Sequence, residues 1–291
     1  MNVNLTVVAQ TQIGLRRQLN EDALMIADLT DGRRLDATRV AKVDVGRNGM
    51  LLAVSDGTGG SKAGGEASAL VVESLRRGMA RPFGRPDERV LEAATQQANR
   101  EVWLAGQSPG HERMGATLTA VFIHDETAHI AEVGDSRAYL VRGGDVQQVT
   151  RDQTCVQIML ENGALNPQDA KRARFSSVLL QTMGLRDGLQ VGLGRLDLRQ
   201  GDCLVLCSDG LSSVVSADEI GRVVCSGELR SACATLVGLA MKRGGDDDVT
   251  VIVAKVSGDL PPVVAGEGIS NTLVQICDFD LRPRIVHHAA Q

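Results

Sequence analysis

Residues 51–60 read Leu-Leu-Ala-Val-Ser-Asp-Gly-Thr-Gly-Gly, a short apolar run followed by a carboxylate and then by glycines. The four apolar residues predict a buried strand. Because the glycines leave the backbone open, Asp56 and the carbonyl group of Gly57 would present two oxygen atoms from the end of that strand. Residues 203–210 repeat the pattern and place Asp209 at the end of a second strand. Two strand ends that carry hard oxygen ligands suggest a metal site.

A single Asp-Gly pair after a strand is weak evidence, because it is also one of the commonest ways to make a tight turn. Three further acidic clusters flank apolar runs, and they read Asn20-Glu21-Asp22, Gly134-Asp135-Ser136-Arg137 and Asp246-Asp247-Asp248. Taken alone, the second of these is better explained as a turn with a local ion pair than as a metal ligand. Five acidic clusters that bracket apolar strands nevertheless favour a site built from carboxylates.

The amino-acid composition limits the classes of protein to which the chain can belong. With 291 residues and 43% apolar content, the chain can bury one large core. A net charge of −5 argues against a nucleic-acid partner, and an aromatic content of 2% leaves little to stack on bases.

The six cysteines include no Cys-x-x-Cys pair. Cys203 and Cys207 would face one side of a single strand as small apolar fillers, in preference to zinc or redox chemistry. The chain shows neither a signal-peptide pattern nor an apolar run of about 18 residues. These features predict a cytoplasmic protein without a membrane partner.

Hydrophobic periodicity predicts the order of the elements. Helices are expected over residues 63–79, 87–104, 217–224 and 228–243. Strands are expected over residues 5–11, 23–29, 117–123, 127–133, 138–142, 146–149, 202–208 and 249–256, with a polar hairpin loop over residues 31–48. Short connections between strands indicate antiparallel hairpins, and separate helical blocks argue against a doubly wound parallel sheet. We therefore expect an α+β fold, a four-layer α/β/β/α sandwich of two antiparallel sheets flanked by helix pairs.

Two segments stand apart from this pattern. Residues 152–184 carry few strand signals and predict two helices, over 154–161 and 167–172. Residues 257–291 open with Gly258 and a Pro-Pro pair, which is typical of a linker, so they are interpreted as a linker and tail of unknown role. Within this tail, residues 271–278 could form a strand or a short helix.

With these motifs in hand, the chain resembles the metal-dependent serine/threonine protein phosphatases of the PPM family (phosphatase type 2C), in their bacterial form. The resemblance covers about residues 5–256. The motifs stand in the order of that family: Arg17-Gln18-Leu19-Asn20-Glu21-Asp22, Ser55-Asp56-Gly57-Thr58-Gly59-Gly60, Gly115-Ala116-Thr117-Leu118, Gly134-Asp135-Ser136-Arg137, Ser208-Asp209-Gly210-Leu211 and Asp247-Asp248-Val249-Thr250. The resemblance implies a phosphatase catalytic domain over residues 1–256, with residues 152–184 as a flap beside the active site.

The resemblance also implies a ligand set. Asp56 would bridge two ions, Gly57 would offer its backbone carbonyl group to one of them, and Asp209 and Asp247 would hold the other. Asp135, together with Asp209, would bind a weaker third ion. Because all of these donors are oxygen atoms, the implied ions are Mn²⁺ or Mg²⁺.

Three further residues complete the implied site. Glu21 and Asp22 would hold metal-bound water, and Arg17 would grip the phosphate with its planar fork. Arg17 is chosen over Arg16 from its spacing to Asp22, and Asp247 over its neighbours from the family pattern.

The implied reaction is direct attack on the phosphate by a hydroxide that two metal ions share, without a phosphoenzyme. Thr58 and Ser61 occupy positions where relatives carry other residues, and neither donates a proton well near neutral pH. Metal-bound water would then protonate the leaving group. Asp248 stands where the family has Asn, so it would either add a carboxylate next to the metal or face solvent.

The predicted function is hydrolysis of phosphoserine and phosphothreonine in proteins by a monomeric enzyme that opposes a Ser/Thr kinase. The flap carries Lys171, Arg172 and Arg174, which either form a solvated helix face or receive the acidic flanks of a phosphopeptide. Two alternatives stay open at this point: a pseudophosphatase, and a regulatory binding module of a kinase signalling system.

Overall fold

Two antiparallel sheets form the centre of the protein. The computed structural model describes residues 2–36, 38–58, 62–80, 87–111, 114–170 and 178–280. The six-stranded sheet contains, in spatial order, β10 (Asp145–Gln148), β9 (Arg137–Arg142), β12 (Cys203–Cys207), β13 (Val249–Gly258), β1 (Val3–Gln12) and β4 (Ala41–Asp44). The eight-stranded sheet contains β14 (Leu273–Cys277), β11 (Gly192–Asp197), β8 (Thr127–Val133), β7 (Leu118–His124), β5 (Met50–Thr58), β2 (Asp22–Asp28) and β3 (Arg33–Arg34), with β6 (Gly115–Ala116) paired to the end of β5.

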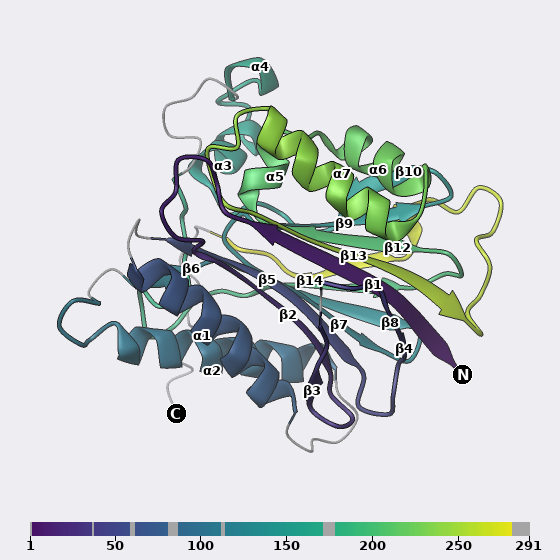
Figure 1. Ribbon diagram of the computed structural model, residues 1–291, viewed down its shortest axis with the longest axis horizontal. Coiled ribbons are helices and arrows are strands. Elements are labelled where there is room, and N and C mark those ends of the chain that lie inside the picture. Colours follow the sequence, from purple (N-terminus) through teal and green to yellow (C-terminus); the bar gives the residue numbers. More distant parts are fainter. Residues whose placement is uncertain are drawn as a thin grey trace, which may run out of the picture.

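Helices cover the outer face of each sheet (Figure 1). Helices α1 (Lys62–Met79) and α2 (Glu88–Ala105) lie on the eight-stranded sheet. Helices α5 (Asp209–Ser212), α6 (Ala217–Cys225) and α7 (Leu229–Lys242) lie on the six-stranded sheet. The expected four-layer α/β/β/α sandwich is therefore confirmed.

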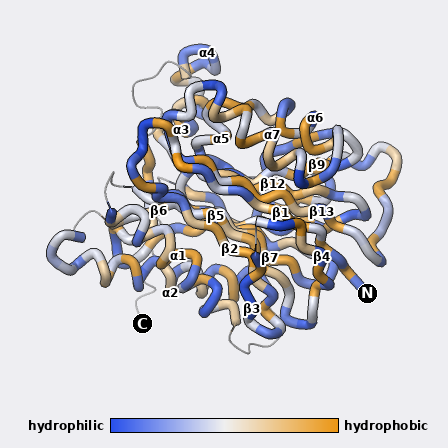
Figure 2. The backbone as a smooth tube through the Cα atoms, viewed as in Figure 1, coloured by the Kyte–Doolittle hydropathy of each residue, from blue (hydrophilic) through white to orange (hydrophobic). Residues whose placement is uncertain are grey.

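The alternation of side chains along the strands explains why two sheets and two helical layers fit together. In β5, Leu51 and Ala53 face the α1 and α2 layer, whereas Leu52 and Val54 face the other sheet. All four side chains are fully buried, because a central strand of a sandwich packs on both of its faces. Figure 2 shows the same apolar character along β5, β12 and β13.

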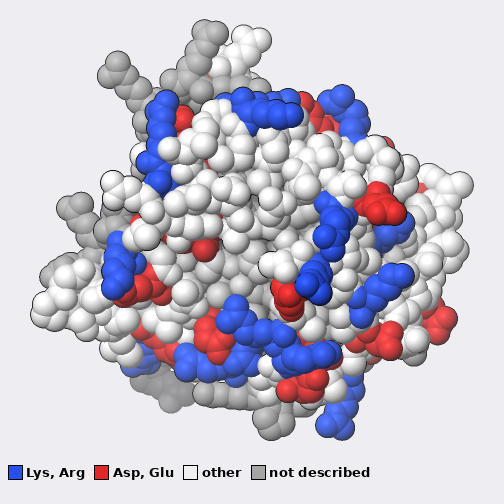
Figure 3. All heavy atoms as spheres, in the orientation of Figure 1, with Lys and Arg blue, Asp and Glu red and all other residues white. Residues whose placement is uncertain are grey.

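Charged side chains lie on the surface around this core. On the face seen in Figure 3, basic and acidic residues are interspersed, rather than gathered by sign. None of the helices that the structure describes combines the length and the apolar character needed to cross a lipid bilayer.

The polar segment 31–48 is more than the expected hairpin loop. Its two short strands join different sheets, because β3 pairs with β2 and β4 pairs with β1. The segment therefore crosses from one sheet to the other.

The described residues of the flap form two helices, as expected, α3 (Cys155–Glu161) and α4 (Pro167–Ala170). Lys171, Arg172 and Arg174 lie outside the described residues, so the interpretations offered for them stay predictions.

Within residues 257–291, the structure decides the alternative left open for residues 271–278 in favour of a strand. A 3₁₀ turn, η1 (Ile269–Asn271), leads into β14, which pairs with β11 and extends the eight-stranded sheet. Leu260, Ile269 and Phe279 are buried, at 5–8% exposure. Residues up to 280 therefore belong to the packed domain.

Candidate metal centre

The register of β2 and β5 brings two of the acidic motifs together. Asp22, the first residue of β2, lies directly opposite Asp56 of β5. The amide of Gly57 donates to the carbonyl oxygen of Glu21 at 3.1 Å. Motifs that lie more than thirty residues apart in the sequence thus meet at one end of the eight-stranded sheet.

The six-stranded sheet contributes from its own strand ends. Asp209 follows β12 at the start of α5. The hydroxyl of Ser208 donates to Asp22 Oδ2 at 2.7 Å and accepts from the amide of Thr250 at 3.0 Å. Sequence reasoning did not assign a role to Ser208 or Thr250, although both stand inside the motifs it singled out. These two residues connect the two halves of the site.

The carboxylates of this cluster repel one another. Burial is the largest cause that raises the pKa of Asp22, to about 7, and it also raises the pKa of Asp56 well above its usual range. The charges of Asp22 and Asp209 raise the pKa of Asp56 further. Burial and then the charge of Asp247 raise the pKa of Asp209. Crowded acids of this kind favour a bound cation, which would stabilise all of them as carboxylates.

Two oxygen atoms of the cluster are unsatisfied. Asp22 Oδ1 and Asp209 Oδ1 are both buried, and neither hydrogen-bonds to any group that the structure describes. A buried carboxylate oxygen without a partner is costly, and a metal ion would remove that cost. Because the donors are carboxylates, Mg²⁺ and Mn²⁺ fit them better than zinc does.

Asp247 belongs to the same cluster but is held by an arginine. Arg17 Nη2 lies 2.5 Å from Asp247 Oδ1, and Arg17 Nη1 lies 3.6 Å from Glu21 Oε2. The described residues contain no group of three or more His, Cys, Asp and Glu side chains that is arranged to hold an ion by itself. The charge of Asp247 nevertheless raises the pKa of both Asp56 and Asp209, so the three side chains lie in one cluster, with Arg17 paired to Asp247. Mg²⁺ usually keeps several waters, so one or two protein ligands to each ion suffice.

Asp135 lies at the edge of the cluster, after the end of β8. Burial raises its pKa to about 8, and the charge of Asp209 is the next cause. Its neighbour Arg137 binds the carboxylate of Asp152 through Nη2 at 2.6 Å and Nε at 2.8 Å. The ion pair in this turn is therefore made by Asp152 rather than by Asp135.

Arg16, Asp246 and Asp248, the sequence neighbours of Arg17 and Asp247, are placed differently from those two residues. Arg16 pairs with Asp246 at 3.0 Å on the surface, where their side chains are 77% and 61% exposed. Asp248 is buried, and its two oxygens accept from the amides of Gly14 at 2.9 Å and Glu21 at 2.7 Å. The interpretation of Asp248 as a solvent-facing acid is wrong, because the side chain is buried. Its charge raises the pKa of Asp22, so it does add a carboxylate beside the cluster. The structure places Arg17, and not Arg16, at the cluster.

A close backbone approach explains one glycine of the central motif. A Cβ atom on Gly57 would lie 2.3 Å from the carbonyl oxygen of Gly64 and 2.7 Å from that of Glu21. Only glycine fits between β2 and the start of α1, so the Asp-Gly sequence serves packing as well as chemistry.

The remaining expectations concern residues beside the cluster. Thr58 is the last residue of β5, whereas Ser61 lies outside the described residues. Cys203 and Cys207 are buried on one face of β12, and burial raises the pKa of both thiols to about 12. The interpretation of these cysteines as apolar fillers is confirmed.

Comparisons with known proteins agree with this geometry. The family model described as "Protein phosphatase 2C" matches residues 31–235. The chain is 34% identical over 221 residues to the serine/threonine protein phosphatase PstP of Mycobacterium tuberculosis, covering 74% of this chain but only 43% of that relative. It is 35% identical over 219 residues to the protein phosphatase PhpP of Streptococcus pneumoniae, covering 73% of this chain and 87% of that relative.

Solved structures show the same architecture. The catalytic domain of the serine threonine protein phosphatase PstP, solved in complex with two manganese ions, superposes with a TM-score of 0.73 at 31% identity. That match covers 88% of this chain and 100% of the other. The S. agalactiae serine/threonine phosphatase superposes with a TM-score of 0.76 at 28% identity, over 86% of this chain and 98% of the other. The fold, the order of the acidic motifs and these matches together show that the chain belongs to the protein phosphatase 2C family.

Proposed function

We propose that this protein is a metal-dependent phosphatase that hydrolyses phosphoserine and phosphothreonine in proteins. The observation that carries the proposal is the cluster of buried, mutually repelling carboxylates of Asp22, Asp56 and Asp209, two of which have an unsatisfied oxygen. PstP, one of the relatives named above, is a serine/threonine protein phosphatase, which supports the same substrate class.

Two Mn²⁺ or Mg²⁺ ions fit the site. Asp56 would bind both ions. The carbonyl group of Gly57 would be a further ligand of one ion, and Asp209 and Asp247 would be ligands of the other. Asp135 stands beside Asp209, where a weaker third ion would find a carboxylate. When bound, the ions supply an activated solvent nucleophile and neutralise phosphoryl oxygens.

The residues around the ions would orient the reactants. Glu21 and Asp22 would hold water molecules beside the ions. The hydroxyl of Ser208 orients the Asp22 carboxylate by donating a hydrogen bond to it at 2.7 Å. Arg17 would bind the phosphate with two of its N–H groups. Its side chain is 32% exposed and reaches solvent at the cluster. To bind a phosphate with these N–H groups, Arg17 would break its ion pair with Asp247. The Asp247 carboxylate would then be free to bind a metal ion.

The wider setting follows from the substrate class. A phosphoprotein is the proposed partner, and a Ser/Thr kinase would have produced it. A monomeric state and a cytoplasmic location stay predictions. No observation favours the pseudophosphatase or the regulatory binding module.

The decisive experiment replaces the carboxylates one at a time. Asp56→Asn and Asp209→Asn should each lower Mn²⁺-dependent hydrolysis of an aryl phosphate by more than about 100-fold, because a direct ligand matters more than a residue that orients one. Both variants should fold, as circular dichroism would show, since each change removes a buried charge from a repelling cluster. Asp246→Asn, on the exposed neighbour, is the matched control and should keep full activity.

Wild-type activity in both variants would overturn the proposal. The substrate class is tested separately, by phosphate release from phosphothreonine and phosphotyrosine versions of one peptide. Equal rates on the two would argue against a serine/threonine phosphatase.

A further inference from the structure

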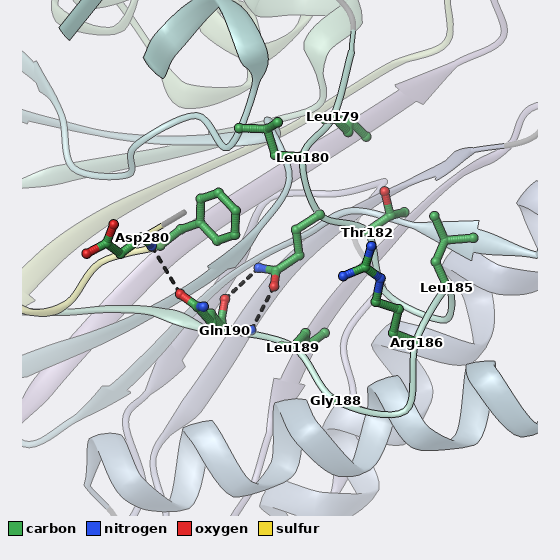
Figure 4. A pocket seen from close by; sticks show the side chains of 11 residues that line it. Leu179, Leu180, Thr182, Leu185, Arg186, Gly188, Leu189, Gln190 and Asp280 are labelled. Atoms are coloured by element: carbon green, nitrogen blue, oxygen red, sulfur yellow. Dashed lines mark hydrogen bonds between the residues drawn. The ribbon is translucent and has the colours of Figure 1, made fainter. Parts of the chain in front are cut away.

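A cavity of about 710 Å³ opens between two parts of the chain (Figure 4). One is residues 178–190, here called the 178–190 loop, and the other is residues 260–280, here called the C-terminal segment. Five apolar side chains line it: Leu179, Leu180, Leu185, Leu189 and Phe279. Figure 4 shows Thr182, Leu185 and Arg186 rising on the same side of the loop. Leu185 is 56% exposed, so the cavity presents apolar surface to solvent.

The loop wall of this cavity is held rigidly by α2. The buried side chain of Asn99 accepts from the amide of Gly184 at 2.8 Å and donates to the carbonyl oxygen of Arg186 at 2.9 Å. Gln96 donates to the carbonyl oxygen of Leu189 at 2.8 Å. Fixed backbone of this kind makes a preformed cavity, which costs little ordering entropy when a ligand enters.

The opposite wall comes from the C-terminal segment. Gln190 Oε1 accepts from the amide of Asp280 at 3.0 Å, and Arg151 donates to the carbonyl oxygen of Phe279 at 2.9 Å. Gln181 exchanges two hydrogen bonds with the backbone of Gln190, at 2.7 and 2.5 Å. The glutamine side chains are thereby engaged with the backbone, and the wall formed by the five apolar side chains suits an apolar group. Thr182, Arg186 and Asp280 give the rest of the cavity a polar lining. Residues 279 and 280 lie outside the family match, which ends at residue 235.

The cavity adjoins the metal centre through β6. Met183 exchanges two backbone hydrogen bonds with Ala116, at 2.8 and 3.2 Å, and Ala116 pairs with Gly57. Two strand spacings of about 4.8 Å separate the backbones of Met183 and Gly57 by about 10 Å. An extended peptide advances about 3.3 Å per residue, so it would reach the cavity about three residues from the phosphorylated one.

We propose that this cavity is a substrate subsite that binds an apolar side chain of leucine size, about three residues from the phosphorylated serine or threonine. The occupant is a segment of the phosphoprotein, because Thr182 of the cavity wall packs against Gly115, which pairs with Thr58 at the end of β5 beside the metal centre. The inference rests on the proposed phosphatase function, and it gives the C-terminal segment a role, since Phe279 completes the subsite.

The test is a positional scan of phosphothreonine peptides. One peptide is made with leucine or serine at each of the four positions on either side of phosphothreonine, and kcat/KM is measured with the full chain and Mn²⁺. Leucine at one position two to four residues from the phosphothreonine should raise kcat/KM by about tenfold over serine. Leu185→Asp should abolish this preference, and Leu104→Asp, on a leucine that is 53% exposed and does not line the cavity, should keep it.

Phe279→Ala tests the opposite wall of the cavity. Thermal unfolding checks that this variant folds. It should weaken the leucine preference without changing kcat/KM for an aryl phosphate, which is too small to reach the cavity. A flat scan in the wild type, or the same preference in Leu185→Asp as in the wild type, would overturn the subsite. The aryl phosphate separates the two proposals, because loss of that activity in the wild type would reject the phosphatase function itself.

Discussion

Three consecutive aspartates show how much a residue's role depends on its surroundings. Asp246 forms an exposed ion pair with Arg16, Asp247 pairs with Arg17 at the carboxylate cluster, and Asp248 is buried. Asp248 connects the two ends of the segment from Gly14 to Glu21 by accepting both of their amides. That segment carries Arg17, so Asp248 acts on the site by positioning the backbone.

Asp248→Ala should therefore destabilise the protein and the site together. The change leaves two buried amides without an acceptor, and each unmade bond costs about 1–3 kcal/mol. We expect the free energy of unfolding in urea to fall by about 3 kcal/mol, with a lower kcat for an aryl phosphate. Asp246→Ala removes an exposed ion pair and should change stability by less than about 1 kcal/mol. Equal effects of the two substitutions would contradict the role given to Asp248.

At the scale of elements, one buried ion pair joins the two sheets and the C-terminal segment. Arg142 of β9 binds Asp202 at 2.7 Å, and the two side chains are 1% and 0% exposed. Arg142 also donates to Thr272 Oγ1 at 2.6 Å and to the carbonyl oxygen of Asp197, at the end of β11, at 2.9 Å. A single guanidinium group thus connects a strand of one sheet with a strand end of the other.

Arg142→Met should be strongly destabilising, because it leaves the carboxylate of Asp202 buried without its cation. Breaking a buried pair in this way costs about 3–5 kcal/mol. Chemical denaturation would measure the loss. Arg16→Met, which breaks the exposed pair with Asp246, is the matched control and should cost less than about 1 kcal/mol. If Arg142→Met unfolds at the same denaturant concentration as that control, the Arg142–Asp202 ion pair contributes nothing to the stability of the fold.

At the scale of the whole molecule, the C-terminal segment completes a sheet and closes part of the core. Strand β14 covers the edge of β11, and Leu260, Ile269 and Phe279 bury their side chains against the domain. The segment to which the sequence assigned no role therefore contributes to stability.

A chain that ends at Asp259 tests this contribution. Each of the three lost apolar side chains is worth about 1.5–3 kcal/mol, so the shortened chain should lose at least about 4 kcal/mol of stability. Thermal unfolding should shift down by many degrees, or the chain should fail to fold cooperatively. An unchanged unfolding temperature would restore the linker interpretation.

The sequence by itself determined the elements and the acidic motifs of this protein. Strand and helix periodicity are local properties, so β5, β12, α1 and α2 could be predicted within a few residues. The choice of Arg17 over Arg16 also came from local spacing. The carboxylates could be named because each follows a strand inside a short motif.

Only the tertiary structure decided how these parts meet. The register of β2 on β5 sets Asp22 opposite Asp56, and Ser208 joins them to the other sheet. The sequence left residues 271–278 open between a strand and a short helix, and the edge of β11 decided for the strand β14. Asp248 differs from Asp246 through amides more than 200 residues away in the chain. Contacts of that range depend on where the folded backbone goes, which no local pattern of residues records.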